Sequence, residues 1–432
     1  MVLLRELFAF QPATGWRSDK NRLVLALLTF SLWLGASAIL PMLPLYLSKS
    51  GSGSFGVGVV MSAYYIGAVV TQIPVGKLVD RIGPPPVIVV GLCIFGLSSI
   101  LFAPVSGVIP AVIFRSLQGI GAGAVTVACI VAVSVTPGKG QKGASLGMIY
   151  GSQMMATALG PVVGSIVGTT SLRLLFILAG LLGILTAILS GLYFFGTNTR
   201  RSLFAPRSTM DRVSDDVSSE VSKPAVVGAS PGNFPAKRNP FRFSGYERIP
   251  FLDKKSKSRF IAGLLAFSVL GYLPGSYESY WALYLHLRHA TSLEIGLSWT
   301  LFALPYAFLA VPAGHLAERR SKKFLMTTTL VWSGLFAAIY PELHLVPLIV
   351  GLAVFEATGA VLASPTATLL ISDAVPASWQ GRAQGMAATF WTLFAGMGAL
   401  VGGALFSISY MLPFFVLAAL LVLIALSQMY LL

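Results

Sequence analysis

Charged residues are scarce in this sequence. Asp, Glu, Lys and Arg together make up 10% of its 432 residues, whereas hydrophobic residues make up 55%. A soluble domain with so few charges would expose large apolar patches and precipitate from water. The composition therefore excludes an ordinary soluble protein and indicates a chain whose surface faces lipid.

Cysteine and histidine are also rare, with two and four copies. Cys93 and Cys129 lie within apolar runs, so neither has the context of a disulfide framework, and we expect both to be small packing residues. Only His286 and His289 could share a helical face, which gives no metal-binding cluster. No motif pairs a nucleophile with a base. We therefore expect neither an enzyme nor a cofactor.

Long apolar runs are what the sequence has in abundance. A helix needs about 20 apolar residues to cross roughly 30 Å of hydrocarbon, where the backbone finds no water to bond. Twelve runs meet this requirement, so the sequence predicts an all-α membrane protein. The expected spans are 23–47, 55–75, 85–105, 108–135, 144–168, 173–196, 259–287, 293–317, 324–341, 345–372, 383–407 and 411–431.

The basic residues indicate the orientation of these spans. Lys and Arg number 30, against 15 Asp and Glu. With both termini in the cytoplasm, all the basic residues lie on the cytoplasmic side except Lys49, Arg173 and Arg288, which lie outside, and Arg115, which lies within a span. This bias predicts a multi-pass protein of the cell (inner) membrane with both termini cytoplasmic. Membrane lipids are then the expected partner of the basic loops, and nucleic acid is not.

The chain divides into four segments. Residues 197–258 are rich in Ser, Pro and charge and show no apolar period, which predicts a disordered cytoplasmic linker. The expected segments are a cytoplasmic tail (1–22), an N-terminal six-helix bundle (23–196), the linker (197–258) and a C-terminal six-helix bundle (259–432).

An internal repeat relates the two bundles. A shift of 238 residues places the loop that starts at Gly76 on the loop that starts at Gly314, with Gly, Leu, an acid and Arg coinciding. The same shift places Gly147, Gly160 and Gly164 on later glycines without a gap. Two regions that align at one offset indicate two copies of a six-helix unit in parallel orientation, as in transporters built from repeats.

Three motifs in the chain resemble those of the major facilitator superfamily, and within it the twelve-span drug:proton antiporters. The loop after span two resembles the family's G-x-L-x-D-R-x-G signature, although Pro84 and Pro85 replace its closing basic pair. Span four is similar to the R-x-x-Q-G motif, and span five to the antiporter motif, in which Ala156 replaces one glycine. The matching residues are Gly76, Leu78, Asp80, Arg81 and Gly83; Arg115, Gln118, Gly119 and Gly121; and Gly147, Gly160, Pro161 and Gly164.

The resemblance implies two pseudo-symmetric bundles in the major facilitator fold and roles for these motifs. The signature loop and its second copy, Gly314, Glu318 and Arg319, would form a conformational gate on the cytoplasmic side. The antiporter motif favours export over import. We expect the Gly160–Pro161 pair to bend span five and let it pack closely against a neighbouring helix.

Ionisable residues inside spans are the candidates for proton coupling. Each costs roughly 2.5 to 3.5 kcal/mol on insertion scales, so such residues mark functional sites. Arg115 would tune the pKa of a neighbouring acid or of a substrate anion. Alternatively, it would form a buried structural ion pair or bond to carbonyl groups. Glu278 follows Pro274–Gly275, expected to break or kink its helix, and would load and release a proton, or be solvated in an outer vestibule. Glu356, near mid-membrane, would face the central cavity or be a neutral acid bonded to a neighbouring helix.

Aromatic and amide side chains in the spans are the candidates for substrate binding. Tyr277 and Trp281 could stack on a flat or cationic solute, whereas we assign Tyr284, on the same stripe, to the aromatic belt at the membrane interface. Other polar side chains within spans are further candidates: Gln118, Gln153, Tyr64, Tyr65 and Gln72.

These patterns favour a secondary active transporter that exports a small amphipathic or cationic compound by alternating access, with the proton gradient as energy source and no cofactor. Its expected partners are a small-molecule substrate, protons and lipids, and we expect a monomer. Two alternatives stay open: a flippase for a glycolipid or lipid-linked headgroup, or a sugar or amino-acid exporter, on the same fold. A third, of another class, is a non-transporting membrane sensor or assembly factor.

Overall fold

A computed structural model describes residues 16–135, 142–196, 253–376 and 379–432, and nearly all of these residues are helical. The N-terminal half comprises α2 (Trp16–Ile39), α3 (Leu43–Lys49), α4 (Gly53–Ile82), α5 (Pro84–Phe102), α6 (Val108–Val135), α7 (Lys142–Thr170) and α8 (Leu172–Gly196). The C-terminal half comprises α11 (Lys254–Leu287), α12 (Ser292–Arg319), α13 (Lys322–Ile339), η1 (Tyr340–Glu342), α14 (Val346–Ala360), α15 (Ala363–Ser372), α16 (Gln380–Ile408) and α17 (Leu412–Leu431).

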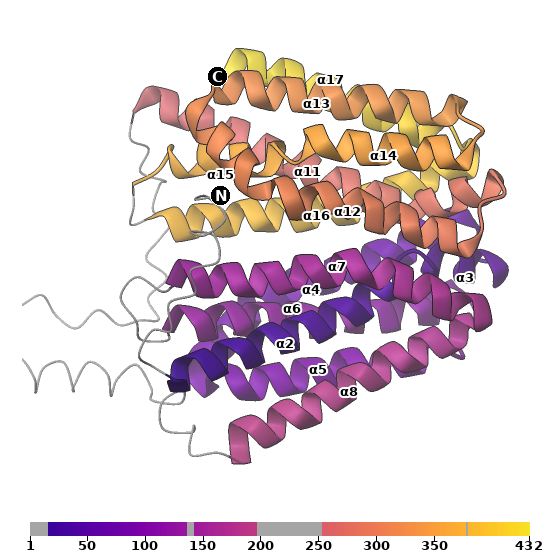
Figure 1. Cartoon of the computed structure of the whole chain (residues 1–432), viewed down its shortest axis with the longest axis vertical. Coiled ribbons are helices and arrows are strands. Elements are labelled where there is room, and N and C mark those ends of the chain that lie inside the picture. Colours follow the sequence, from indigo (N-terminus) through magenta and orange to yellow (C-terminus); the bar gives the residue numbers. More distant parts are fainter. Residues whose placement is uncertain (1–15, 136–141, 197–252, 377–378) are drawn as a thin grey trace, which may run out of the picture.

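The two halves form two bundles whose helices run along a common direction (Figure 1). In the first, α4 packs on α6 and α2 on α7; in the second, α11 packs on α16 and α13 on α17. The halves meet along two seams, α4 against α16 and α7 against α12. We call the end where α8 stops and α11 begins the linker end, and the opposite end, which carries α3 and η1, the far end.

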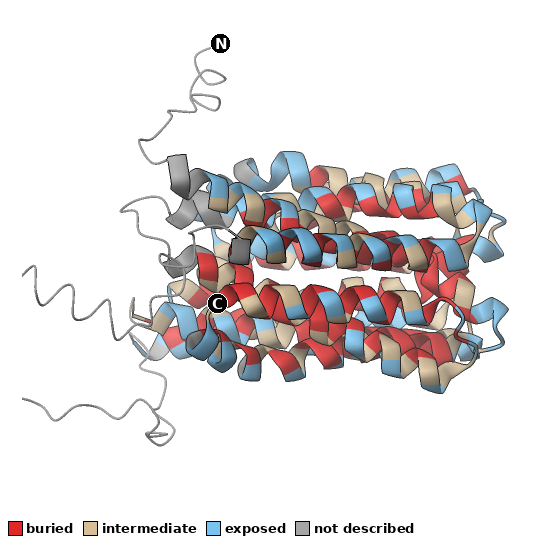
Figure 2. Ribbon diagram, turned by 90° about the horizontal axis from the view of Figure 1, so that it is seen from below, coloured by how far each residue is buried: buried red, intermediate tan, exposed pale blue. Residues whose placement is uncertain are grey.

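The outer surface of the bundles is apolar, as a lipid-facing surface must be. Figure 2 shows the buried residues on the inward faces of the helices and the exposed ones on the outside. Large apolar side chains such as Ile109, Leu192 and Phe308 are exposed. Eleven helices in the described part of the chain are long and apolar enough to span a membrane. The expected fifth span, α7, falls outside this set because it carries Ser, Thr, Gln and several glycines.

Two expected spans are interrupted helices. The first breaks between α2 and α3 at Leu40–Met42, and the tenth breaks between α14 and α15 at Val361–Leu362. Each break lies four residues before a proline, Pro44 or Pro365, whose ring clashes with the carbonyl group at that distance and which has no N–H to bond it. By contrast, α11 continues through Pro274, and α7 continues through Pro161. The helix is therefore not broken at Pro274–Gly275, where a break or a kink was expected.

Capping residues mark the beginning of α11 and α12. Thr291 and Glu294 form a capping box at the start of α12, and the Asp253 carboxylate accepts hydrogen bonds from Ser256 at the start of α11. Because Asp253 caps the helix, α11 begins at Lys254, within the stretch assigned to the linker from the sequence. The rest of that linker, residues 197–252, lies outside the described residues.

Candidate functional site

Arg115 lies buried in the N-terminal half, on α6. Its Nη1 donates a hydrogen bond to Gln118 Oε1 at 2.7 Å, and Gln118 Nε2 donates to Ser99 Oγ at 3.1 Å. The guanidinium also stands over the Tyr64 ring, 4.6 Å from its centroid. No acid among the described residues forms an ion pair with it. Arg115 is therefore held by an amide and an aromatic face rather than by the structural ion pair considered above.

Gln118 differs from its predicted role. It was expected to contact substrate, but its side chain has no exposed surface, and its hydrogen bonds with Arg115 and Ser99 both stay within the N-terminal half. Gln118 holds Arg115 in place instead. Under the 238-residue shift its counterpart is Glu356, which is also fully buried.

A hydrogen bond between Tyr65 and Glu278 joins the two halves. The Tyr65 hydroxyl on α4 donates to Glu278 Oε2 on α11 at 2.6 Å. The Tyr65 ring packs edge-on against Tyr64 at 5.6 Å and lies 6.4 Å from the Trp391 ring of α16. Arg115, Tyr64, Tyr65 and Glu278 thus form a continuous row from the interior of one bundle into the other.

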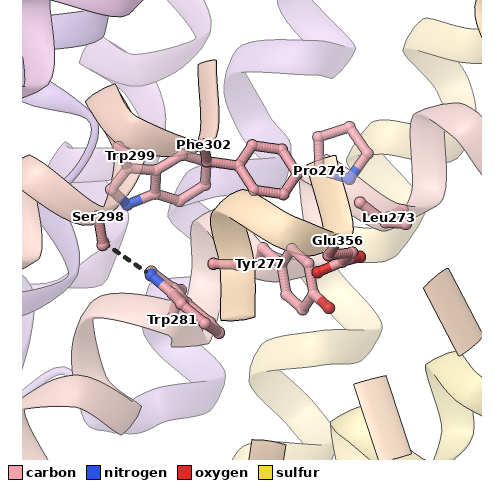
Figure 3. Close-up of a pocket in the computed structure, with 9 residues that line it drawn as sticks. Leu273, Pro274, Tyr277, Trp281, Ser298, Trp299, Phe302 and Glu356 are labelled. Carbon is pink, nitrogen blue, oxygen red and sulfur yellow. Dashed lines mark hydrogen bonds between the residues drawn. The ribbon is translucent and has the colours of Figure 1, made fainter. Parts of the chain in front are cut away.

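Glu356 on α14 lines a pocket inside the C-terminal half. The Tyr340 hydroxyl donates to Glu356 Oε2 at 2.7 Å, as expected for an acid bonded to a neighbouring segment. Glu356 Oε1, however, is buried without a hydrogen-bond partner. Figure 3 shows the pocket between α11, α12 and α14, with Trp281 bonded to Ser298 at 3.0 Å. The remaining lining residues are Leu273, Pro274, Tyr277, Trp299, Phe302 and Ala353.

The aromatic stripe of α11 is an interior feature along its whole length. Tyr277 and Trp281 are buried and line the Glu356 pocket; their predicted contact with substrate stays a prediction. Tyr284 is also fully buried, and its hydroxyl donates to the carbonyl groups of Tyr340 and Leu343. The assignment of Tyr284 to the interfacial belt is therefore wrong. A period of three to four residues places a side chain on a face but does not say whether that face meets lipid or protein.

The halves are in close contact toward the far end. A Cβ built on Gly58 of α4 would lie 2.7 Å from the Ala399 carbonyl oxygen of α16, and one on Gly403 would lie 2.6 Å from the Gly58 Cα atom. On the second seam, the Thr300 hydroxyl of α12 donates to the Ala158 carbonyl group of α7 at 2.6 Å. Both seams are therefore tightly packed over this part of their length.

The antiporter motif lies on that second seam. The backbone of α7 at Pro161 faces α12, because a Cβ built on Gly296 of α12 would lie 2.5 Å from the Pro161 carbonyl oxygen. Gly160 and Gly164 face the other way, and a Cβ on either would overlap α2 at Ser37 or Ala38. Gly147, at the start of the motif, has no described atom within 4 Å of such a Cβ. The motif therefore binds α7 to its own bundle on one side and to the other half on the opposite side.

The seams are looser toward the linker end. Apart from the chain neighbours and helix backbone of each glycine itself, nothing in the described part of the chain lies within 4 Å of a Cβ built on Gly76, Gly147, Gly314 or Gly385. An opening between α4 and α16 is lined there by both polar and apolar side chains: Gln72, Gly385, Met386, Thr389 and Phe390. The structure is thus closed between the halves at the far end and opens toward the linker end.

Gln153 on α7, another candidate for substrate binding, is partly exposed.

The predicted gate residues lie at the linker end. Gly83, with φ 82°, links α4 to α5, and Pro84 and Pro85 form the first turn of α5 in place of a basic pair. Arg81, Glu318 and Arg319 are exposed, whereas the side chain of Asp80 lies outside the described residues. Sequence reasoning missed an ion pair here, Lys322 Nζ to Asp373 Oδ2 at 2.7 Å, because Lys322 begins α13 whereas Asp373 follows the end of α15, far away in the sequence.

Two parallel bundles with polar groups at their junction define the architecture of a secondary transporter. The chain matches the family described as Major Facilitator Superfamily over residues 25–291 and 258–432. The protein therefore belongs to the major facilitator superfamily. It is a multi-pass membrane transporter and not an enzyme.

Individual relatives agree with this family. The chain is 22% identical over 406 residues to the quinolone resistance protein NorA of Staphylococcus aureus (strain MRSA252), covering 92% of each chain. It is 30% identical over 173 residues to the uncharacterized MFS-type transporter MJ1560 of Methanocaldococcus jannaschii, covering 40% of this chain and 45% of that one.

Solved structures show the same fold. A bacterial homolog of the human lysosomal transporter Spinster, in an inward-facing and occupied conformation, matches with a TM-score of 0.75, 12% identity and 97% coverage of both chains. A single-site mutant of the nucleoside transporter NupG matches with a TM-score of 0.70, 13% identity and coverage of 95% of this chain and 99% of that chain.

Proposed function

We propose that the protein is a proton-coupled exporter of small amphipathic or cationic compounds that works by alternating access. The relative named for quinolone resistance aligns with 92% of the chain, which favours a drug-type substrate. The basic loops favour an orientation with the linker end in the cytoplasm. In that orientation the closed far end and the open linker end correspond to the state that receives substrate from the cytoplasm.

The observation that carries this proposal is the hydrogen bond between Tyr65 and Glu278. A carboxylate accepts this bond more strongly than a neutral acid, because hydrogen bonds to charged groups are worth more. Protonation of Glu278 would therefore loosen a contact between the halves, and loss of the proton would restore it. A group with this property links proton binding to the balance between two conformations.

Arg115 supports the same chemistry from the opposite side of the row. Its charge stays fixed at any ordinary pH. Through Tyr64 and Tyr65 it places a permanent positive charge on the same row of side chains as Glu278. Glu356, which has no basic neighbour among the residues lining its pocket, provides the second acid of the exchange.

A transport assay tests the proposal. The purified protein is reconstituted in liposomes with an acidic lumen, and ethidium, a fluorescent planar cation, is added outside. Uptake above that of protein-free liposomes is expected while the pH gradient lasts, and it should stop when an ionophore exchanges protons for potassium. Uptake that continues at the same rate after the pH gradient has been removed would contradict proton coupling.

A further inference from the structure

The Glu356 carboxyl group is hydrogen-bonded on one side only. The Tyr340 hydroxyl donates to its Oε2 at 2.7 Å, whereas Oε1 is buried and has no partner among the described residues. Leaving a buried oxygen without a donor is costly, so such an atom calls for an explanation. An acid with only a structural role would gain stability from a second donor. The asymmetry therefore indicates an acid that has a use for its free oxygen.

The other titratable side chains around Glu356 do not bond to it. In the described part of the chain, those close enough to interact with its charge are all tyrosines: Tyr277 and Tyr280 on α11, Tyr306 on α12 and Tyr340. Of these four, Tyr340 alone donates to the acid within the described residues. Tyr277 and Tyr280 end in buried hydroxyl groups without a partner of their own. One donor, at the start of the segment that precedes α14, thus distinguishes the two carboxyl oxygens.

That segment, η1, is fixed to α11 by two side chains. The Tyr284 hydroxyl donates to the carbonyl groups of Tyr340 and Leu343. Arg288 Nη2 donates to the Pro341 carbonyl oxygen at 2.7 Å. A helical segment of three residues has no stability of its own, so these bonds from α11 determine where η1 lies.

The donor and the acid are also held from other sides. The Tyr340 ring is fully buried, and its centroid lies 5.1 Å from that of Trp281 and 6.2 Å from that of Phe414. The Trp332 indole N–H of α13 donates to the Glu356 backbone carbonyl oxygen at 3.2 Å. Packing therefore fixes the direction of the hydroxyl, and a backbone bond fixes the position of the acid, as a precise contact requires.

We propose that Tyr340 positions Glu356 for proton uptake: its hydroxyl binds Oε2 and leaves Oε1 as the oxygen that carries the proton. In the neutral acid, Oε2 is then the carbonyl oxygen, and the bond from Tyr340 persists in both protonation states. Tyr340 acts only through Glu356, and α11 acts on Tyr340 through Tyr284. This assignment rests on the proposed function for the role of Glu356 as an acid that takes up and releases a proton.

Infrared difference spectroscopy tests this assignment. The purified protein in lipid bilayers is perfused alternately with acidic and alkaline buffer, and the Glu356 carboxylic C=O band is the one that Glu356→Gln lacks. A carbonyl group that accepts a hydrogen bond absorbs at lower wavenumber than a free one. In Tyr340→Phe the band should therefore move to higher wavenumber, because Oε2 loses its donor. A band that stays in place would overturn the assignment, because Oε2 would not be the bonded carbonyl oxygen.

A second variant and a matched control locate the effect. Tyr284→Phe keeps the Tyr340 hydroxyl but frees the η1 carbonyl groups, so the band should broaden and move in the same direction. This variant decides the question if Tyr340→Phe does not fold. Tyr280→Phe removes an unpartnered hydroxyl from an equally buried ring, and its band should match that of the parent protein. An unchanged band in Tyr284→Phe, or an equal shift in Tyr280→Phe, would contradict the assignment.

Uptake by the same proteins separates this assignment from the proposed function. A Glu356 band that shifts in Tyr340→Phe, in a protein without gradient-driven uptake, would contradict proton coupling and leave the positioning role standing. Gradient-driven uptake together with a band that does not shift would do the reverse. The absence of any band that depends on Glu356 would contradict both, because the acid would then bind no proton.

Discussion

Replacing Gly58 by valine should force the far end of the transporter open. The new side chain would meet the Ala399 carbonyl oxygen and the Gly403 backbone, neither of which is the movable end of a side chain. Overpacking at such a contact costs about 1 to 3 kcal/mol. The contact exists only while the far end is closed, so the cost falls on that state alone. The closed form should therefore lose population by roughly 5- to 150-fold relative to the far-open form.

Electron paramagnetic resonance distances measure this shift. Spin labels at Ser50, between α3 and α4, and at Ser407, near the end of α16, stand on opposite sides of the first seam at exposed positions. Cys93 and Cys129 are replaced first. The longer distance should gain population in Gly58→Val relative to the parent protein. Gly351→Val, which adds the same side chain where no described atom lies within 4 Å, should leave the distribution unchanged. Identical distance distributions in Gly58→Val and the parent protein would refute the claim that α4 and α16 are in close contact at the far end.

Two further changes test the contacts between elements. Tyr65→Phe removes only the hydroxyl group that donates to Glu278. A hydrogen bond to a charged group is worth about 1.5 to 3 kcal/mol, so gradient-driven uptake in liposomes should fall by about tenfold or more. An unchanged rate of uptake would exclude this bond from the coupling. Lys322→Met should barely alter stability, because the ion pair with Asp373 is partly exposed and such pairs contribute about 0 to 1 kcal/mol. A large fall in the thermal unfolding temperature would show that this ion pair contributes more to stability than that.

The positions of the membrane-spanning helices could be predicted from the sequence, because hydrophobicity determines them. Every expected span has a helix at its position, because an apolar run of that length has no alternative in a bilayer. The breaks at Leu40–Met42 and Val361–Leu362 were missed, because Pro44 and Pro365 lie in apolar runs that look continuous. Pro274 shows the converse, since α11 continues through it. A proline in a span thus signals a break only when its neighbours do not hold the helix together.

The site followed only in part. Arg115, Glu278 and Glu356 stand out in any sequence of this kind, because charge in a span is rare. The bond from Tyr65 to Glu278 joins residues 213 apart, and no local pattern predicts such a pairing. The contacts of Gln118 were not predicted for a related reason: a polar residue in a span can bond to a neighbouring side chain or face a cavity, and the helical period does not distinguish the two.

The exchange of protons for substrate is the central claim, and one comparison tests it most directly. Glu278→Gln and Glu356→Gln are reconstituted beside the parent protein, and ethidium uptake and proton release are recorded together under an imposed pH gradient. We expect both variants to lose uptake against a concentration gradient, together with the proton flux that accompanies it. If both variants move substrate at the parent rate and with the parent proton stoichiometry, the two acids do not carry the coupling.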